Sequence, residues 1–226
     1  MKKVLYAVVV IVGLLGAAWA ADTWARGRAV EEIRAAVAES TGADPEVTVT
    51  GFPFLTQLAA GEMDLVEVTI AEMSLSGVRV EGVRLEARGV ATDPPYRIAA
   101  LTATGLVPIA EVNRLFGEAS NLDAEVVVDG DAVALTGEVL GLELGISFLL
   151  EPADGGITLV PDAVSVAGRS LDLSALGGWM SALSAEVTLP IELPEGMRLA
   201  AVEPAPGGVL VRVEGMDVIP EPAMFR

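Results

Sequence analysis

The chain has no histidine and no cysteine, and its only lysines are Lys2 and Lys3. Beyond these first residues it cannot build a Ser-His, Cys-His or Ser-Lys nucleophile. Zinc sites made of histidine or cysteine are excluded for the same reason, and no disulfide can form. We expect no cofactor. The enzymatic chemistry that stays open is a pair of carboxylates, as in glycoside hydrolases, in which one group must be desolvated to hold a proton.

Basic side chains are scarce in the whole chain. Lys and Arg number 14 against 32 Asp and Glu, which gives a net charge of −18 at pH 7. Such a surface repels the phosphates of nucleic acids, and no basic cluster reverses the charge locally, so nucleic-acid binding is excluded. A polybasic attachment to anionic lipid headgroups is not expected either. Contact with a membrane surface must therefore be apolar or tethered.

The acidic residues suggest no calcium site. Asp129-Gly130-Asp131 lacks the ligand spacing and the closing glutamate of an EF-hand loop. Short strands predicted at 125–128 and 132–136 flank this motif. We therefore predict a tight hairpin turn at Asp129-Gly130.

The N-terminus carries an export signal. Two lysines precede an uncharged run of 18 residues, Val4 to Ala21, which lies between the length of a signal-peptide core and the roughly 20 residues of a transmembrane helix. Ala18-Trp19-Ala20 has the small-x-small form of a cleavage site, so a cleaved signal peptide and a retained anchor both stay open. In either case we expect the following chain outside the cytoplasm, secreted or in the cell envelope.

Hydrophobic periodicity then predicts one amphipathic helix. Asp22-Thr23 is suited to cap a helix that runs from about Trp24 to Ser40, with Gly42 beyond its end. Its apolar stripe comprises Val30, Ile33 and Val37. A helix with one such stripe needs a partner surface.

From Val47 onward the period falls to two, which predicts half-buried strands. The apolar phase reverses after Ile70 and again at Glu81-Gly82, and each reversal predicts a bulge or a turn. A second helix is predicted over 108–118, with Ile109, Val112, Leu115 and Phe116 on one face. Further strands are predicted at 142–148, 187–193 and 209–213, and one or two helical turns at 174–183.

These elements indicate an α+β fold, with a signal or anchor over 1–21 and a single domain over 22–226. We expect long antiparallel strands with one apolar face, in a sheet that curls wholly or only partly around the N-terminal amphipathic helix. The predicted helices offer limited area to cover that face. The face is therefore either a closed core or an apolar groove for acyl chains, and periodicity does not separate the two.

Three stretches carry a resemblance to a known family. They are "GFPFLTQLAAGEMDLVEVTI" at 51–70, "VPIAEVNRLFGE" at 107–118 and "LPIELPEGMRLAAVEPAPGGVLVRVEGMDV" at 189–218. Following an export signal and one amphipathic helix, they resemble the actinobacterial LmeA-like phospholipid-binding family. The resemblance implies an exported cell-envelope protein that binds phospholipid, has a fold like the tubular, BPI-like lipid-binding proteins and is linked to lipoglycan maturation. It implies no catalytic motif.

With this resemblance, the stretch after Gly51 becomes a candidate lipid contact. Glycine and proline would bend the backbone so that apolar side chains form a stiff lip, suited to acyl chains or to a bilayer surface. The lip comprises Phe52, Pro53, Phe54, Leu55 and Leu58. The alternative is that the two rings plug the end of the core, while Thr56 and Gln57 satisfy the backbone of the turn.

Other candidates lie on the later elements. Phe116, Leu144, Ile146 and Phe148 are apolar positions that serve a core, a lipid tunnel or both. Arg114 is the headgroup candidate, because arginine makes bidentate contacts with phosphate. The alternative for Arg114 is an ordinary helical ion pair with Glu111 or Glu118.

The sequence therefore favours a phospholipid-binding protein of the cell envelope that carries or presents lipid. Two other functions stay open. One is an adaptor whose apolar face is a dry core and whose ligand is another envelope protein. The other is a carboxylate-dependent glycan hydrolase, which requires one carboxylate with a raised pKa in a cleft.

Overall fold

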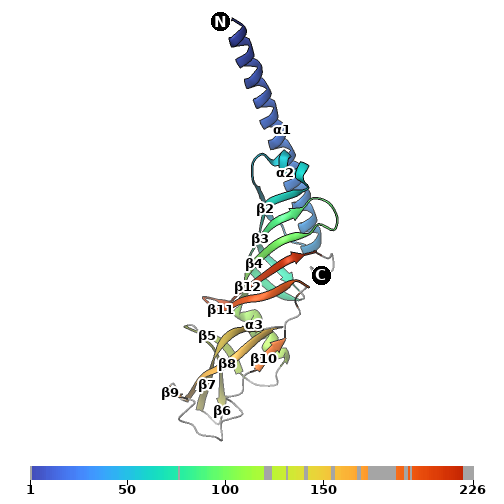
Figure 1. The fold of residues 1–226 in the computed structure, drawn as a ribbon. Coiled ribbons are helices and arrows are strands. Elements are labelled where there is room, and N and C mark those ends of the chain that lie inside the picture. The colour runs from blue at the N-terminus through green and yellow to red at the C-terminus, as the bar shows by residue number, and fades with distance from the viewer. Residues whose placement is uncertain are drawn as a thin grey trace.

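The computed structural model describes residues 2–75, 77–119, 124–130, 132–139, 142–153, 156–166, 169–172, 187–190, 193 and 195–220. The described strands form two six-stranded antiparallel sheets. The molecule is elongated: helix α1 (Lys2–Thr41) projects from one end, and the second sheet lies at the other (Figure 1). The predicted α+β fold, with an antiparallel sheet wrapped about the N-terminal helix, is confirmed, and its strands divide between two sheets.

Helix α1 is longer than the sequence predicted, because it runs without a break through Asp22-Thr23. The predicted cap there is wrong. Thr23 Oγ1 donates to the carbonyl of Trp19, 2.9 Å away, within the same helix. Helix α1 contains no proline, and the residues around this point are rich in alanine, so the helix continues through it. Its predicted end is confirmed: Gly42 has a φ of +69° and donates to the carbonyl of Ala38.

Among the residues whose side chains the structure describes, no helix is both long and apolar enough to cross a membrane.

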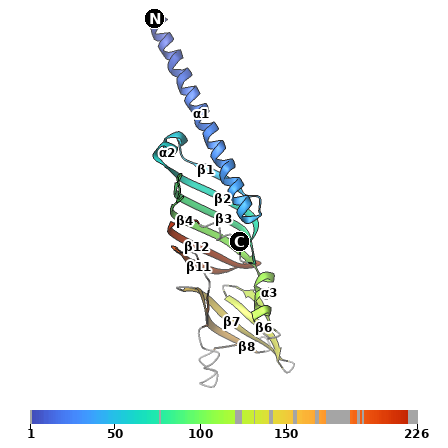
Figure 2. The same ribbon diagram turned by 90° about the vertical axis from the view of Figure 1, so that its right-hand side faces the viewer.

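The first sheet has the strand order β1-β2-β3-β4-β12-β11. Its strands are β1 (Glu46–Thr50), β2 (Glu62–Leu75), β3 (Val78–Ala91), β4 (Ile98–Pro108), β12 (Gly208–Val218) and β11 (Met197–Ala205). Helix α1 lies across one face of this sheet (Figure 2). The predicted stripe of Val30, Ile33 and Val37 packs on the sheet as expected, joined by Ala25 and Ala29.

One of the two predicted irregularities is present in the first sheet. The pairing of β3 with β4 shifts between Glu81 and Arg84, and Gly82 there has a φ of +58°. This is the bulge predicted at the second phase reversal, and it increases the local twist of the sheet. After Ile70 the prediction is wrong, because the β2–β3 pairing keeps its register there.

The second sheet has the order β10-β8-β7-β6-β5, with β9 also paired to β8. Its strands are β5 (Ala124–Asp129), β6 (Ala132–Val139), β7 (Leu142–Ala153), β8 (Gly156–Val166), β9 (Arg169–Asp172) and β10 (Val187–Pro190). Asp129 pairs with Ala132 across Gly130, which confirms the predicted hairpin. The helical turns predicted at 174–183 lie outside the described residues.

Helix α3 (Ile109–Ala119) confirms the second predicted helix and lies at the junction of the two sheets (Figure 2). Ile109, Val112 and Phe116 pack on a core cluster whose buried members come from both sheets. Those members are Val126 and Val133 from the second sheet and Leu199, Val202 and Val209 from the first. The sheets therefore share one hydrophobic core at their junction.

Candidate functional site

Each sheet has one apolar face and one polar face. In the first sheet, directly paired apolar residues form a row across all six strands: Val47, Val68, Leu85, Ala103, Val213 and Leu199. The neighbouring row on the opposite face is polar: Thr48, Glu67, Glu86, Thr102, Glu214 and Arg198. Successive residues of a strand point to opposite faces, so this alternation separates the two faces across the whole sheet.

The second sheet repeats the pattern. Its apolar row runs through Val126, Leu135, Ile146, Val164 and Leu171. Its polar row runs through Glu125, Thr136, Gly145, Ser165 and Ser170. Because the shared core joins apolar residues of both sheets, the two apolar faces meet at the junction. The molecule thus carries apolar surface along most of its length.

The described helices cover this surface unevenly. Under α1 the first sheet is closed: Val66 and Ile70 are buried. Farther from the helix, Val83, Leu85 and Val213 are only half-buried. All three still pack on one of the two core clusters, so this stretch of the apolar face is less fully covered than the part under α1.

The predicted lipid contacts fall into two groups. Phe116 packs at the junction, and Ile146 and Phe148 are half-buried on the apolar face of the second sheet. Leu144 pairs with Gly137 in the same sheet, but its side chain lies outside the described part. The lip that follows Gly51 is at the other end of the first sheet, beside α1 (Figure 1). The structure does not bring the two groups together.

Most of the lip lies on a short helix, α2 (Phe54–Ala60), which Phe52 and Pro53 precede, rather than in an open turn. Its two rings have opposite environments: Phe54 is fully buried and Phe52 is 71% exposed. Leu55, Leu58 and Pro53 are also exposed. The plug and the lip that the sequence left as alternatives therefore both occur, one for each ring.

Helix α2 is fastened to α1 by buried polar contacts. Asp22 Oδ1 accepts a hydrogen bond of 2.9 Å from the backbone N–H of Leu55. Arg26 pairs with Asp22 at 3.1 Å, donates to the carbonyl of Gly51 at 2.7 Å and lies over the ring of Phe54. Sequence reasoning missed Asp22 and Arg26 as fastening residues. The sequence does offer one signal. Asp22 follows the uncharged run directly and stands four residues before Arg26, which is the spacing of a helical ion pair.

The turn also satisfies its own backbone. Thr56 Oγ1 donates to the carbonyl of Pro53, and Gln57 Oε1 accepts from the backbone N–H of Asp64 at 2.9 Å. Gly51 has a φ of +112°, and a Cβ at that position would lie 2.0 Å from Gln57 Nε2. Only glycine fits there.

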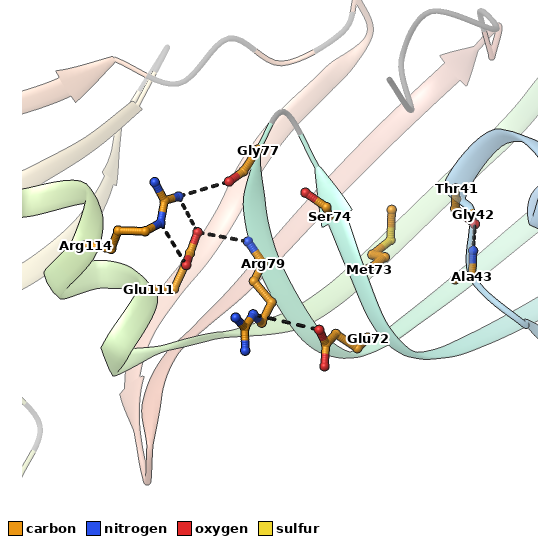
Figure 3. A pocket seen from close by; sticks show the side chains of 10 residues that line it. All are labelled: Thr41, Gly42, Ala43, Glu72, Met73, Ser74, Gly77, Arg79, Glu111 and Arg114. Atoms are coloured by element: carbon orange, nitrogen blue, oxygen red, sulfur yellow. Dashed lines mark hydrogen bonds and ion pairs between the residues drawn. The ribbon is translucent and has the colours of Figure 1, made fainter. Parts of the chain in front are cut away.

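A pocket of about 560 Å³ lies beside the β2–β3 hairpin, at the ends of these strands that are farther from the lip. It is bounded by the end of α1, the β2–β3 hairpin and α3 (Figure 3). Its lining comprises Thr41, Gly42, Ala43, Glu72, Met73, Ser74, Gly77, Arg79, Glu111 and Arg114. The pocket is polar and carries charges of both signs, in contrast to the apolar face beside it.

Glu111 organises this pocket. Its buried carboxylate accepts hydrogen bonds from Arg114 Nε and from the backbone N–H of Arg79, both at 3.1 Å (Figure 3). These contacts, first the one from Arg114 and then the one from Arg79, lower the pKa of Glu111 to about 2. The carboxylate is therefore a fixed negative charge that holds α3 to the hairpin.

Arg114 forms the ion pairs that the helical spacing predicted, with Glu111 and Glu118. It also donates to the carbonyl of Gly77 at 3.0 Å. The two carboxylates raise the pKa of Arg114, so it stays charged. Its side chain is still 41% exposed at the pocket. Arg79 is 58% exposed and makes only a long, 3.8 Å ion pair with Glu72 among the described contacts of its side chain.

Among the described residues, no group of three or more acidic side chains is placed to hold a metal ion. What the described residues bring to the candidate site is apolar side chains and two arginines. Arg79 and Glu111 were not singled out from the sequence, because their meeting requires the β2–β3 hairpin to approach α3, 32 residues away along the chain.

Comparison with known proteins gives the family. No curated protein and no solved structure matches the chain. The model of one family, described as LmeA-like phospholipid-binding, matches residues 16–214. That match covers α1 from Gly16 onward, α2, α3 and the strands of both sheets up to Glu214 in β12. The chain therefore belongs to the LmeA-like phospholipid-binding family.

Proposed function

We propose that the chain is an extracytoplasmic phospholipid carrier that lays acyl chains along the apolar face of its sheets. Membership of a phospholipid-binding family supports lipid binding. The observation that carries the proposal is the apolar row across all six strands of the first sheet, which continues through the shared core into the second. In a closed core the helices would cover this apolar surface fully, whereas here they leave part of it half-buried.

The half-covered stretch of the apolar face between α1 and the junction suits hydrocarbon. Val83, Leu85 and Val213 are aliphatic and half-buried, and they offer contact area without requiring hydrogen-bond partners. An acyl chain laid over them removes apolar surface from water on both sides, at about 25 cal/mol per Å². Phe116, Ile146 and Phe148 extend this surface past the junction.

The polar pocket at the edge of the first sheet is where we place the headgroup. Arg79 has an exposed guanidinium with little competition from its long ion pair, so it is free to contact a phosphate. Arg114 is more firmly held and contributes a fixed positive charge. Glu72 adds an exposed carboxylate on the same pocket, so charges of both signs suit a zwitterionic headgroup.

The N-terminal sequence supports a place in the cell envelope. The two N-terminal lysines and the uncharged run of 18 residues that follows them favour translocation of the rest of the chain. There the protein would carry or present phospholipid, in support of lipoglycan maturation. The alternative of a hydrolase finds no support at Glu111, because its pKa is lowered and a general acid needs a raised one.

Native mass spectrometry tests the proposal. A chain that begins at Ala21 keeps every α1 residue that packs on the first core, and it can be purified without detergent. We expect retained mass that extracts as phospholipid, or uptake of phospholipid from vesicles. Ile146→Glu should lose this mass, whereas the matched Leu149→Glu on the opposite face should keep it, since Leu149 is already 38% exposed. Folded protein that stays empty in both assays would overturn the proposal and favour a protein partner.

A further inference from the structure

The end of the molecule where α1 leaves the sheet exposes large apolar side chains. Those on α1 are Leu15, Trp19 and Trp24, exposed by 65%, 64% and 72%. Those before and on α2 are Phe52, Leu55 and Leu58, exposed by 71%, 40% and 37%. We define these six residues as the collar. No residue from Gly51 to Gly61 is charged, although the chain as a whole carries a net charge of −18.

The collar lies on two opposite faces of α1 instead of on one. At 100° per residue, Leu15 and Trp19 share the face of α1 that carries Asp22 and α2, whereas Trp24 points to the opposite face. Trp19 and Trp24 differ by five positions, or about 7.5 Å along the helix axis. A groove on a partner protein would cover one side of such a structure. A planar medium that encloses the helix covers all of it.

From this geometry we propose that the collar docks on a phospholipid bilayer surface, with α1 entering the bilayer's interfacial layer from the folded domain. Tryptophan and other aromatic rings favour the headgroup level of a bilayer. The two tryptophans of the collar span a depth that matches the roughly 5–10 Å to which interfacial apolar faces are buried, and Leu15 lies deeper. Charge agrees with an apolar contact, because an acidic protein gains nothing from anionic headgroups.

The fastening of α2 gives the collar its rigidity. Asp22 and Arg26 hold the backbone of Leu55 and Gly51 directly at the level where α1 leaves the domain. Phe52 and the α2 leucines therefore keep a fixed height relative to the tryptophans of α1. Docking in this way would orient the long axis of the molecule away from the bilayer and place the start of the apolar face beside it (Figure 2).

The absence of cysteine allows a single-probe experiment on the full chain. An environment-sensitive fluorophore is attached to Ala59→Cys, on the exposed side of α2, and in a second protein to Glu151→Cys, on the second sheet. Both are mixed with phosphatidylcholine vesicles that contain a headgroup spin label. We expect the probe at position 59 to shift to the blue and to be quenched, and the probe at position 151 to respond to neither.

Charge insertion sharpens the test. In the Ala59→Cys protein, Leu58→Asp should abolish the blue shift, whereas Leu149→Asp should leave it unchanged. The two leucines are a matched pair, because they are exposed by 37% and 38%. A chain that floats with vesicles while the probe at position 59 stays in water would overturn the docking proposal. So would a shift that needs no vesicles and grows with protein concentration, which would indicate a second copy on the collar. These outcomes are independent of lipid uptake, which mass spectrometry measures separately.

Discussion

Two corners of the first sheet are fastened in the same way but present different surfaces. At one, Asp22 accepts the N–H of Leu55 while Arg26 donates to the carbonyl of Gly51. At the other, Glu111 and Arg114 repeat this arrangement with other partners. The partners there are the N–H of Arg79 and the carbonyl of Gly77.

In both corners a helical acid and arginine pair reaches the backbone of a separate segment. What differs is the surface that each fastening holds in place: exposed Phe52, Leu55 and Leu58 at the first, and charged Arg79 and Glu72 at the second. The same pair of a helical acid and a helical arginine can therefore hold either an apolar or a polar segment in place. Our proposals place the bilayer at the apolar corner and the lipid headgroup at the polar corner.

The largest expected effect separates the two rings of the apolar corner. Phe54→Ala should lower the free energy of unfolding by about 4 kcal/mol, because a fully buried ring leaves a cavity in the first core. Phe52→Ala should change it by no more than about 0.5 kcal/mol, since that ring is exposed. Chemical denaturation measures both. Equal effects would mean that the two environments are not as distinct as the structure shows.

The second largest effect is expected when the polar contacts between α1 and α2 are removed. Asp22→Ala removes the partner of a backbone N–H and of Arg26, so we expect a loss on the order of 2–3 kcal/mol in the free energy of unfolding. Asp44→Ala is the control, because Asp44 also pairs with an arginine but is 85% exposed. It should cost less than about 1 kcal/mol. Similar losses in the two variants would count against a structural role for the buried pair.

A third test uses pH at the polar corner. The folded pKa of Glu111, about 2, is below its ordinary value of 4.5. Its contribution to stability is therefore complete above about pH 4.5 and is lost as the pH falls towards 2. Glu111→Gln should reduce stability at pH 6 and remove part of the decline between pH 4.5 and 2, as urea unfolding would show. Glu118→Gln, at a carboxylate that is 64% exposed, should leave that decline nearly unchanged.

The smallest expected effect concerns ligand rather than stability. Arg79→Gln should weaken phospholipid uptake with little change in unfolding, because its guanidinium is exposed while its backbone N–H, which binds Glu111, is retained. Arg84→Gln is the matched control on the same strand, and its side chain is exposed on the polar face. Vesicle-to-protein lipid transfer compares them. Equal transfer by both variants would remove Arg79 from the headgroup site.

Local pattern predicted much of this fold. Alternation predicted strands in both sheets, although β4, β8, β9 and β11 were not predicted. The reversal at Gly82 marked a real bulge, and the apolar stripe from Val30 to Val37 faces the sheet. These features depend on neighbours in the chain. The start of α1 was wrong because Asp22 has the side chain of a helix cap but uses it on Leu55, 33 residues away. No local rule identifies such a partner.

The division into two sheets and the assembly of the sites also depended on distant contacts. The apolar row from Val47 to Leu199 forms only once the C-terminal strands pair with β4, which periodicity cannot place. Likewise, Phe52 and Phe54 are two residues apart and equally apolar, yet one is buried and one exposed because α2 begins between them. The sequence named apolar residues and an arginine as candidates for the site, but it could not place them relative to one another.

Photo-crosslinking tests the central claim most directly. A phospholipid with a diazirine in its acyl chain is loaded into the protein, activated by light and mapped by peptide mass spectrometry. We predict adducts on residues of the apolar rows, such as Leu85, Val213 and Ile146, and none on their polar neighbours Glu86, Glu214 and Ser147. Adducts confined to the collar, or spread equally over both faces, would contradict a lipid bound along the sheets.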